Sequence, residues 1–362
     1  MFKNLKPGVL GVTGHQCEMI ELALTYGFQG MDLDAVDFAA RVKLKGLDYA
    51  KRLIVSAQKV APFKIGTFTL PVNLGASDEY YGKDMARLPE ICEAMAAIDC
   101  TVCVLTLPPA NDDRPYHENF EFHKTRLISI AKILEDQGIK LAIGFEAAEY
   151  LRKDCAFQFI HDLEALTLLV KMVGKPNVGI LLDVWNVFVG GGNIDTIRGL
   201  QPEQIMAVQL AELPEGVSLA DVDASSRVLP GEGDGRVDLV GTLEILGVTN
   251  YEGPITVVPS RGIFKTRRRD MIVKRTSFAL DRIWQAAGLT PEGKPGGTVV
   301  TLEESAKSSF EEQETKPPVA PEAEAETEEE VEAEVVVDAI DGEVVVDAVE
   351  GEVKGVDAVE EK

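Results

Sequence analysis

The segment Lys140-Leu-Ala-Ile-Gly-Phe-Glu146 is a short apolar run that ends in an acidic residue. Residues 141–145 are apolar throughout rather than at every second position, a pattern typical of parallel strands covered on both faces. A helical stretch, 122–137, precedes the run and ends at Gly138; its apolar residues at helical spacing are Leu127, Ile130, Ala131 and Leu134. The segment therefore predicts a helix followed by a buried parallel strand.

The same pattern recurs along the first 290 residues. Seven further apolar runs are Val9–Thr13, Phe28–Leu33, Lys64–Leu70, Thr101–Leu107, Val178–Leu182, Ile205–Leu210 and Pro254–Val258. Helical patterns lie between runs at Cys17–Tyr26, from Met85 into the fourth run, at Asp162–Val173 and at Leu239–Leu246. Eight such units in about 285 residues predict an α/β fold, a (β/α)8 TIM barrel. An open doubly wound sheet is the alternative, but the first run is followed by one glycine and not by a Gly-rich phosphate loop.

The acidic charge is concentrated in the last part of the chain. The formal net charge is −24, and residues 301–362 hold 22 of the 60 acids but 4 of the 36 bases. A nine-residue step of Val-Val-Val flanked by carboxylates starts at 334 and 343, with a decayed copy at 352, too few copies for a solenoid. We therefore expect a barrel over 1–290 and a disordered acidic low-complexity tail over 291–362, with docking or calcium binding as the alternative role of the tail. Nucleic-acid binding is disfavoured for both parts.

The sequence favours a cytoplasmic protein. No apolar run has the length of a membrane span, and the first eight residues lack the apolar core of a signal peptide. The five cysteines are scattered, and Cys100 and Cys103 fall in a predicted strand that points them to opposite faces. Buried free thiols in a reducing compartment are a better interpretation than a zinc or redox site.

Polar residues end three consecutive predicted strands. Glu146 follows the fifth strand, Asp183 follows the sixth, and Gln209 lies near the end of the seventh. Chemistry in such barrels sits at the carboxyl ends of the strands, and an all-oxygen set suits a hard divalent cation such as Mg²⁺ or Mn²⁺. The alternative is that each group caps the following helix or pairs with a neighbour.

Several segments resemble the xylose isomerase-like TIM barrel superfamily, and within it the sugar phosphate isomerase/epimerase group. Ketose 3-epimerases, inositol-pathway enzymes and dehydroshikimate dehydratases are relatives of that group. The resemblance covers roughly residues 5–290, most specifically 140–258, and does not include the tail. Its segments are Gly144-Phe-Glu-Ala-Ala-Glu-Tyr-Leu151, Phe159-Ile-His-Asp-Leu163, Asn177-Val-Gly-Ile-Leu-Leu-Asp-Val-Trp-Asn186, Gln204-Ile-Met-Ala-Val-Gln-Leu-Ala-Glu212, Arg227-Val-Leu-Pro-Gly-Glu-Gly-Asp-Gly235 and Tyr251-Glu-Gly-Pro-Ile-Thr256.

The resemblance implies a divalent metal, Mn, Mg or Co, held by four residues at strand ends. Glu146 and Asp183 match the first two ligands, and Gln209 matches the third as a variant of His. The fourth ligand is a glutamate in the family, and this chain has Val258 there. The metal is therefore expected to be weakly bound or absent, with Glu149, Glu212, Asp32 and His15 as possible substitutes.

The resemblance also implies residues that contact substrate. Arg227 corresponds to an arginine that faces substrate oxygens, and Asn186 stands where the family often has His. Trp185 is expected either to stack on a sugar face or to belong to the core. His15 follows the first predicted strand and either contacts substrate or starts a helix. Five cations after the eighth run are either a phosphate or carboxylate site or a solvated face: Arg261, Lys265, Arg267, Arg268 and Arg269.

These residues lead to two functional hypotheses. The first is a metal-assisted isomerase, epimerase-like enzyme or lyase of carbohydrate metabolism, acting on a sugar, sugar phosphate or cyclitol, with Glu146 removing a proton next to a carbonyl. Val258 cannot carry a proton, which disfavours two-base epimerisation and leaves one-base isomerisation or loss of a β-hydroxyl. The second hypothesis is a barrel without catalysis that serves as a binding or scaffold protein. The oligomeric state cannot be derived from these patterns.

Overall fold

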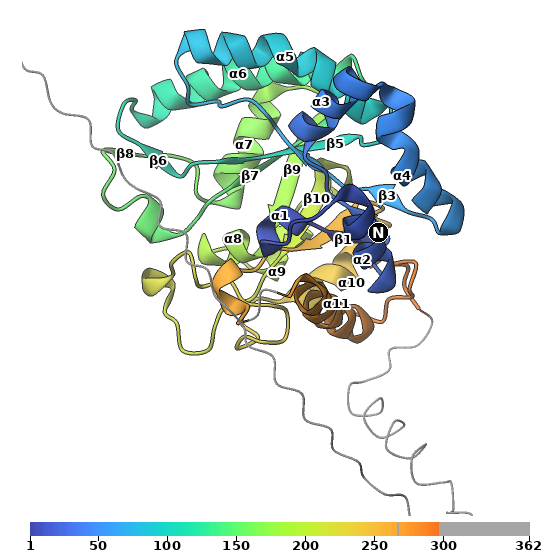
Figure 1. The fold of residues 1–362 in the computed structure, drawn as a ribbon. Coiled ribbons are helices and arrows are strands. Elements are labelled where there is room, and N and C mark those ends of the chain that lie inside the picture. Colours follow the sequence, from blue (N-terminus) through green and yellow to red (C-terminus); the bar gives the residue numbers. More distant parts are fainter. Residues whose placement is uncertain (266–267, 297–362) are drawn as a thin grey trace, which may run out of the picture. The chain divides into compact units, whose positions relative to one another are not determined.

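The computed structural model describes residues 1–265 and 268–296, and the strands of this part form a parallel barrel (Figure 1). The order around the sheet is β3-β2-β1-β11-β10-β9-β7-β5-β4. The strands are β1 (Phe2–Leu5), β2 (Gly30–Met31), β3 (Lys64–Ile65), β4 (Phe68–Thr69), β5 (Val102–Leu107), β7 (Lys140–Phe145), β9 (Val178–Asp183), β10 (Ile205–Leu210) and β11 (Pro254–Val257).

The third strand position of the barrel is formed by two short strands, β3 and β4, and the ring closes there. The predicted run 64–70 is interrupted, so that β3 pairs with β2 while β4 pairs with β5. These two short strands count as one position in the ring, which therefore has eight positions. The predicted (β/α)8 TIM barrel is confirmed.

Helices cover the outside of the ring. In the part of the chain that the structure describes they are α1 (Pro7–Leu10), α2 (Gln16–Thr25), α3 (Ala35–Lys45), α4 (Leu47–Val60), α5 (Asp78–Ala96), α6 (Tyr116–Glu135), α7 (Leu163–Val173), α8 (Val184–Val189), α9 (Ile194–Arg198), α10 (Leu239–Val248) and α11 (Arg269–Ala286). Aspartates start several of them: Asp34, Asp162 and Asp238 each accept a hydrogen bond from a first-turn amide. A separate antiparallel pair, β6 (Ala110–Asn111) and β8 (Phe157–Gln158), joins two loops at the strand ends.

The predicted first strand, Val9–Thr13, is wrong. That segment contains the end of the short helix α1 and a turn at Gly11, and the first strand is β1, seven residues earlier. Polar residues conceal β1 in the sequence: Lys3 forms an ion pair with Asp281 of α11, while Asn4 donates to Thr256 of the neighbouring strand. A strand with polar groups on both faces lacks the apolar run on which the prediction depended.

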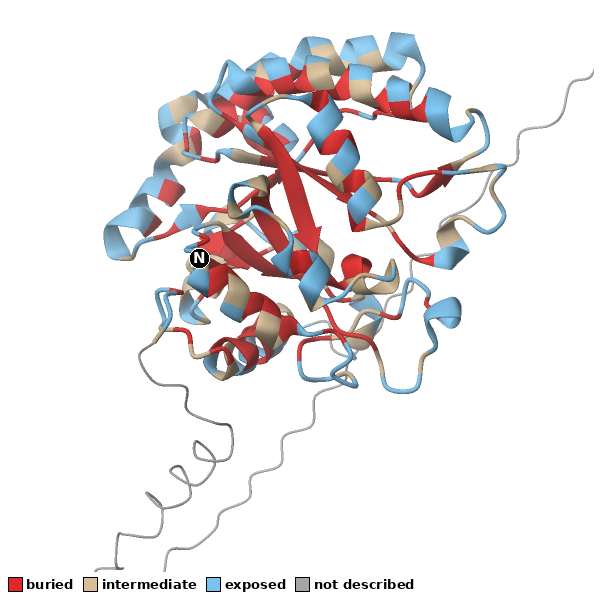
Figure 2. Ribbon diagram, turned by 180° about the vertical axis from the view of Figure 1, so that it is seen from behind, coloured by how far each residue is buried: buried red, intermediate tan, exposed pale blue. Residues whose placement is uncertain are grey.

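The inside of the barrel has an apolar floor. Five buried residues pack together there: Val104, Ala142, Leu181, Met206 and Ala207. Side chains alternate along a strand, so the residues two positions further on also face the inside. These include Thr106 on β5, Asp183 on β9 and Gln209 on β10. The buried strands and the more exposed helices around them are seen in Figure 2. The lumen is therefore apolar below and polar at the carboxyl ends.

The described chain stays attached to the barrel beyond the last helix. Trp284 donates to the carbonyl of Thr290 at 2.8 Å, and the amino group of Met1 donates to Gly293 at 3.4 Å. The predicted tail falls almost wholly beyond residue 296, outside the described residues. Among the described residues no helix is long and apolar enough to cross a membrane. Cys92, Cys100 and Cys103 are buried free thiols, as predicted, and burial raises the pKa of Cys92 to about 12.

Candidate active site

The three polar residues predicted from the sequence lie side by side at the top of the barrel. Gln209 is in register with Asp183 on one side and with Thr256 on the other. The β7–β9 register pairs Ile143 with Ile180, which places Glu146 level with Asp183 three residues further on. The amide of Val258 continues the ladder by donating to Leu210 at 2.8 Å, so Val258 follows Thr256 at the same rim.

Asp183 is committed to protein partners. Its Oδ2 atom accepts hydrogen bonds from both Nη atoms of Arg227 at 2.9 Å, and its Oδ1 atom accepts from the amide of Asn186 at 3.1 Å. Only 5% of Asp183 is exposed. The carboxylate therefore caps α8 and neutralises a guanidinium, which is the alternative role that the sequence had left open.

Trp185 belongs to the core. Its ring is 2% exposed, and its Nε1 atom donates to the carbonyl of Ser226 at 2.8 Å. The guanidinium carbon of Arg227 lies 4.2 Å from the ring centroid, a cation–π contact that covers the outer face. Stacking of Trp185 on a sugar, one of the two predicted roles, does not fit this packing. The ring instead supports Arg227 from below.

Asn186 lies beside Glu146. The residue is 1% exposed; its Oδ1 atom accepts from the amide of Ala147 at 3.0 Å, and its side chain lies close enough to the carboxyl of Glu146 to lower the pKa of that group. The predicted substrate contact at Asn186 is thus better described as a positioning role. Asn186 therefore faces the residues that follow β7, and its side chain favours the ionised form of Glu146.

The pKa of Glu146 is raised above its usual value. Burial is the main cause, and the negative charge of Asp183 adds to it, while Arg227 and the hydrogen bond from Asn186 act in the opposite direction. A carboxylate with a raised pKa is a stronger base than an ordinary one when it is ionised. Tyr150, which the sequence analysis missed, lies close enough for the charge of Glu146 to raise the pKa of its phenol, although burial is the larger cause.

The donor set does not fit a tightly held divalent cation. Asp183 accepts three hydrogen bonds from protein donors, two of them from the Arg227 guanidinium, so most of its acceptor capacity is in use. Arg227 would also bring its positive charge against a cation bound at that carboxylate. Gln209 is neutral and Val258 has no donor atom; in the described residues no group of three or more His, Cys, Asp or Glu side chains could hold a metal. The metal predicted at Glu146, Asp183 and Gln209 remains an untested prediction that this arrangement does not favour.

The suggested substitute ligands have other roles. Glu212 accepts from the amides of Gly231 and Gly235 at 2.6 and 2.8 Å and so closes the loop after β10. His15 is exposed at the start of α2, so its placement at the end of a strand is wrong and the helix-start alternative holds. Glu149 is exposed in the short 3₁₀ turn Glu149–Leu151.

The basic segment after β11 is largely engaged with protein acceptors. Arg261 donates to the carbonyls of Val9 and Gly8, and Arg269 pairs with Glu18. Arg268 pairs with Asp270, whose pKa is lowered by that hydrogen bond. Lys265 is exposed, and Arg267 lies outside the described residues. These contacts favour an architectural role over the predicted phosphate site.

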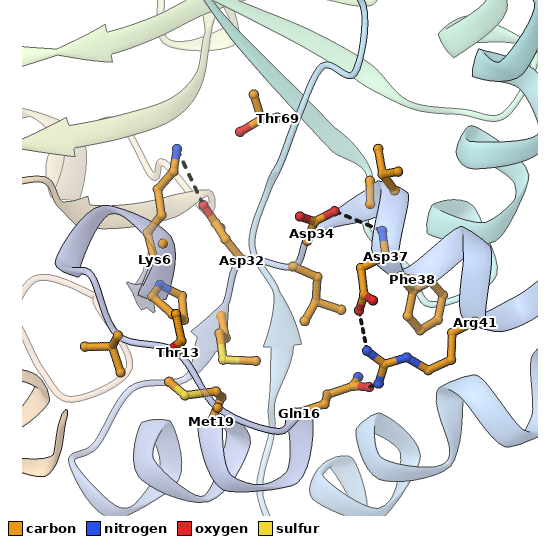
Figure 3. A pocket seen from close by; sticks show the side chains of 18 of the residues that line it. Lys6, Thr13, Gln16, Met19, Asp32, Asp34, Asp37, Phe38, Arg41 and Thr69 are labelled. Carbon is orange, nitrogen blue, oxygen red and sulfur yellow. Dashed lines mark hydrogen bonds and ion pairs between the residues drawn. The ribbon is translucent and has the colours of Figure 1, made fainter. Parts of the chain in front are cut away.

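A cavity of about 520 Å³ opens beside the ends of β1, β2 and β4 (Figure 3). Lys6, Asp32 and Thr69 line it, and the carboxylate of Asp32 accepts from Asn4 and from Thr67. Sequence reasoning missed Lys6 because it placed the first strand too late. The signal that could have revealed it is the run Phe2-Lys-Asn-Leu-Lys6, in which Asn4 and Lys6 share a face.

Comparison with known proteins gives a consistent result. A family described as the xylose isomerase-like TIM barrel matches residues 20–273. A curated 3-dehydroshikimate dehydratase of Pseudomonas putida is 27% identical over 118 residues, which is 32% of this chain and 17% of that enzyme. The match thus spans about a sixth of the relative's length.

Solved structures share the fold. A xylose isomerase domain protein from Alicyclobacillus acidocaldarius has a TM-score of 0.69 at 21% identity, over 78% of this chain and 98% of that one. The IOLI protein with a bound zinc atom has a TM-score of 0.65 at 16% identity, over 80% and 98%. A D-psicose 3-epimerase solved with D-fructose has a TM-score of 0.61 at 15% identity, over 80% and 100%. At these identities the likeness concerns the fold.

Proposed function

Because the chain belongs to the xylose isomerase-like TIM barrel family, we propose that it is an enzyme that removes a proton next to a carbonyl in a small polyhydroxylated substrate. The observation that carries the proposal is Glu146: a half-buried carboxyl at a strand end, beside Asn186 and Arg227, with a pKa that is raised mainly by burial. The dehydratase and epimerase among the similar proteins support an enzyme of this kind.

Glu146 acts as the base in this proposal. Its ionised carboxylate takes the proton from the carbon beside the carbonyl. The electron pair of the C–H bond forms a carbon–carbon double bond, and the π pair of the carbonyl moves onto its oxygen. Burial favours the neutral form of Glu146, so proton uptake relieves an unfavourable buried charge. Asn186 lies beside the carboxyl and favours its ionised form, which is the form that accepts the proton.

Positive charge near the new oxyanion comes from Arg227. A guanidinium has five N–H groups, and Asp183 accepts from two of its Nη donors. Donors therefore remain for a substrate oxygen, and Asp183 and Trp185 fix the plane of the group. Gln209 is half-buried beside Asp183, and among the described residues its side chain has no protein hydrogen bond, so it can bind a substrate hydroxyl. Because the donor set does not fit a resident metal, we assign the electrophilic role to Arg227 and not to a cation.

A single base limits the reaction. Protonated Glu146 can return its proton to the former carbonyl carbon while the hydroxyl of the deprotonated carbon passes its proton to the enolate oxygen, which isomerises the compound. Alternatively, the β-hydroxyl leaves with the proton of Glu146 as water. Val258 offers no proton on the β11 side of the rim. Isomerisation or dehydration therefore fits better than two-base epimerisation.

Val258 also supports a second candidate function, a barrel that binds a ligand without converting it. The two candidates are separated by incubating the protein in D₂O with D-fructose, D-tagatose, D-psicose and 3-dehydroshikimate in turn. An enzyme exchanges the proton next to the carbonyl of at least one of them, as seen by proton NMR. Binding without exchange would favour the second candidate.

A further inference from the structure

Lys6 lies beside Val258, which stands at the position of the family's fourth metal ligand. Strands β1 and β11 are in register with Asn4 opposite Thr256. Lys6 and Val258 are the residues that directly follow these two strands, two positions beyond Asn4 and Thr256, and Lys6 lines the cavity. At the rim, Lys6 after β1 is thus adjacent to Val258 after β11, whose side chain has no metal-binding atom.

The ammonium of Lys6 is available to a ligand. Its Nζ atom is 3.9 Å from Oδ2 of Asp32, beyond hydrogen-bond distance, and the side chain is 18% exposed. Across residues 1–265 and 268–296 no protein acceptor forms a hydrogen bond with this Nζ atom. A partly buried ammonium with three N–H donors that the described chain does not use points to an outside acceptor.

Asp32 fixes this cation without competing for the ligand. Its Oδ1 atom accepts from Asn4 and from the amide of Thr67, both at 2.7 Å, and its Oδ2 atom accepts from the hydroxyl of Thr67 at 2.8 Å. Asn4 is in turn held by Thr256 at 2.9 Å. The carboxylate thus accepts three hydrogen bonds from Asn4 and Thr67, while the ammonium of Lys6, 3.9 Å from Oδ2, makes only an ion pair with it.

The cavity beside Lys6 has the mixed lining of a small-molecule site. Its polar groups include the hydroxyl of exposed Thr69 and the carboxylate of Asp34, and its apolar walls include Met19 and Phe38 (Figure 3). A concave site with a few polar groups on largely apolar walls is the usual form of a pocket for a small ligand.

The charges around the cavity favour an uncharged ligand. Lys6 is balanced by Asp32, and Arg41 at the rim pairs with Asp37 and binds Gln16. Among residues 1–265 and 268–296 no cation pairs with the carboxylate of Asp34, so a phosphate or carboxylate would meet excess negative charge.

We propose that this cavity is a substrate subsite in which Lys6 donates hydrogen bonds to an oxygen of an uncharged polyhydroxylated carbonyl compound. The inference rests on the proposed function, with the reacting carbon at Glu146. Lys6 and Glu146 lie four positions apart in the eight-position ring, on opposite sides of the lumen. The cavity is lined by residues 6–71 and does not include Glu146, so a substrate that reacts at Glu146 has to reach across the mouth to place its other end against Lys6.

The test is ligand binding, measured separately from turnover. D-fructose, D-tagatose and D-psicose are titrated into the parent, Lys6→Met, Thr69→Val and Lys3→Met proteins, and dissociation constants are obtained by calorimetry or NMR. Lys3 is the matched control, because it lies on the same strand and pairs with an aspartate on the outer side. Loss of a charge-assisted hydrogen bond should weaken binding about tenfold or more in Lys6→Met. Thr69→Val should weaken binding by a smaller factor, and Lys3→Met should leave it within twofold.

Several results would overturn the inference. One is equal binding by the parent and Lys6→Met, with melting curves that show both folded. If Lys6→Met does not fold, unchanged binding by Thr69→Val decides against the subsite. Binding of 3-dehydroshikimate but of no ketose by the parent would contradict the uncharged ligand. Failure of the proposed function looks different: binding would depend on Lys6, but Glu146→Gln would exchange protons as the parent does.

Discussion

Arg227 forms a salt bridge with Asp183: both Nη atoms of the arginine donate to Oδ2 of the aspartate at 2.9 Å. Asp183 ends β9, while Arg227 belongs to the segment after β10, and Trp185 packs under the guanidinium. A pair of buried charges thus occupies the region where the resemblance placed a metal ligand. Several properties of the protein should follow from this pair.

Removal of one member should leave the other unpaired in a buried position. Arg227→Met keeps most of the packing on Trp185 but leaves the Asp183 carboxylate with a lost partner. Breaking a buried pair in this way costs about 3–5 kcal/mol of unfolding free energy. Urea denaturation at pH 7 measures the change, and Asp183→Asn in the same background should recover part of it. A loss under 1 kcal/mol in Arg227→Met would show that the pair is not formed in solution.

Replacement of Glu146 should stabilise the protein at neutral pH. The folded-state pKa is raised, so the stability linked to Glu146 is fully present below its unfolded pKa and is lost as the pH rises through the folded value. Each unit of such a shift corresponds to about 1.4 kcal/mol. Glu146→Gln avoids the buried charge, so it should gain stability over the parent at pH 7, and the gain should shrink towards pH 4. Denaturation curves of both proteins at pH 7 and at pH 4 give the stability difference between variant and parent at each pH. A gain that is smaller at pH 7 than at pH 4 would contradict the prediction.

The sequence predicts most of this fold but not its first strand. Runs such as 140–146 are apolar because both faces of their strands are covered, so hydrophobicity alone locates them. Strand β1 carries Lys3 outward to Asp281 and Asn4 inward to Thr256, so it has no apolar run to detect. The error moved the first strand by seven residues, left Lys6 unnoticed and brought His15 to a strand end.

The sequence predicts where the candidate site lies, but it does not predict which side chains contact one another there. Strand ends and register bring Glu146, Asp183 and Gln209 together, as the sequence indicated. The pairing of Asp183 with Arg227 depends on a loop 44 residues away, and side-chain pairs at such separations leave no local pattern. The same reason explains why the sequence placed Asn186 against substrate and left Trp185 open between a sugar contact and the core, although Asn186 accepts from the amide of Ala147 and Trp185 supports Arg227.

Metal should have little effect on the parent protein. Melting curves with a chelator and with Mn²⁺ should differ by a degree or less, because Asp183 is already paired with Arg227. Val258→Glu adds a carboxylate at the rim, and opposite unit charges 4 Å apart attract by about 4 kcal/mol at an effective dielectric of 20. This variant should therefore show a clear Mn²⁺-dependent increase in melting temperature. A large shift in the parent that is lost in Asp183→Asn would instead establish a metal site.

The segment 289–296 should contribute to stability. Leu289 is buried, Thr290 accepts from Trp284, and Gly293 accepts from Met1. A chain that ends at residue 296 should melt close to the full-length protein. A chain that ends at 287 should lose about 2–3 kcal/mol, the worth of one buried leucine and two hydrogen bonds. Equal melting temperatures for the two shortened chains would contradict the packing described.

The central claim is that Glu146 removes a proton next to a substrate carbonyl, and solvent exchange measures that step directly. The parent, Glu146→Gln and Glu149→Gln proteins are incubated in D₂O with D-fructose, D-tagatose, D-psicose or 3-dehydroshikimate, and deuterium uptake beside the carbonyl is followed by NMR. Glu149 is the control because it is an exposed carboxylate three residues further along the chain. Loss of a general base lowers rates about 10²–10⁴-fold, so we expect exchange by the parent and Glu149→Gln and a decrease of that size in Glu146→Gln. Exchange at the parental rate in Glu146→Gln, or no exchange of any of the four compounds by the parent, would contradict the account.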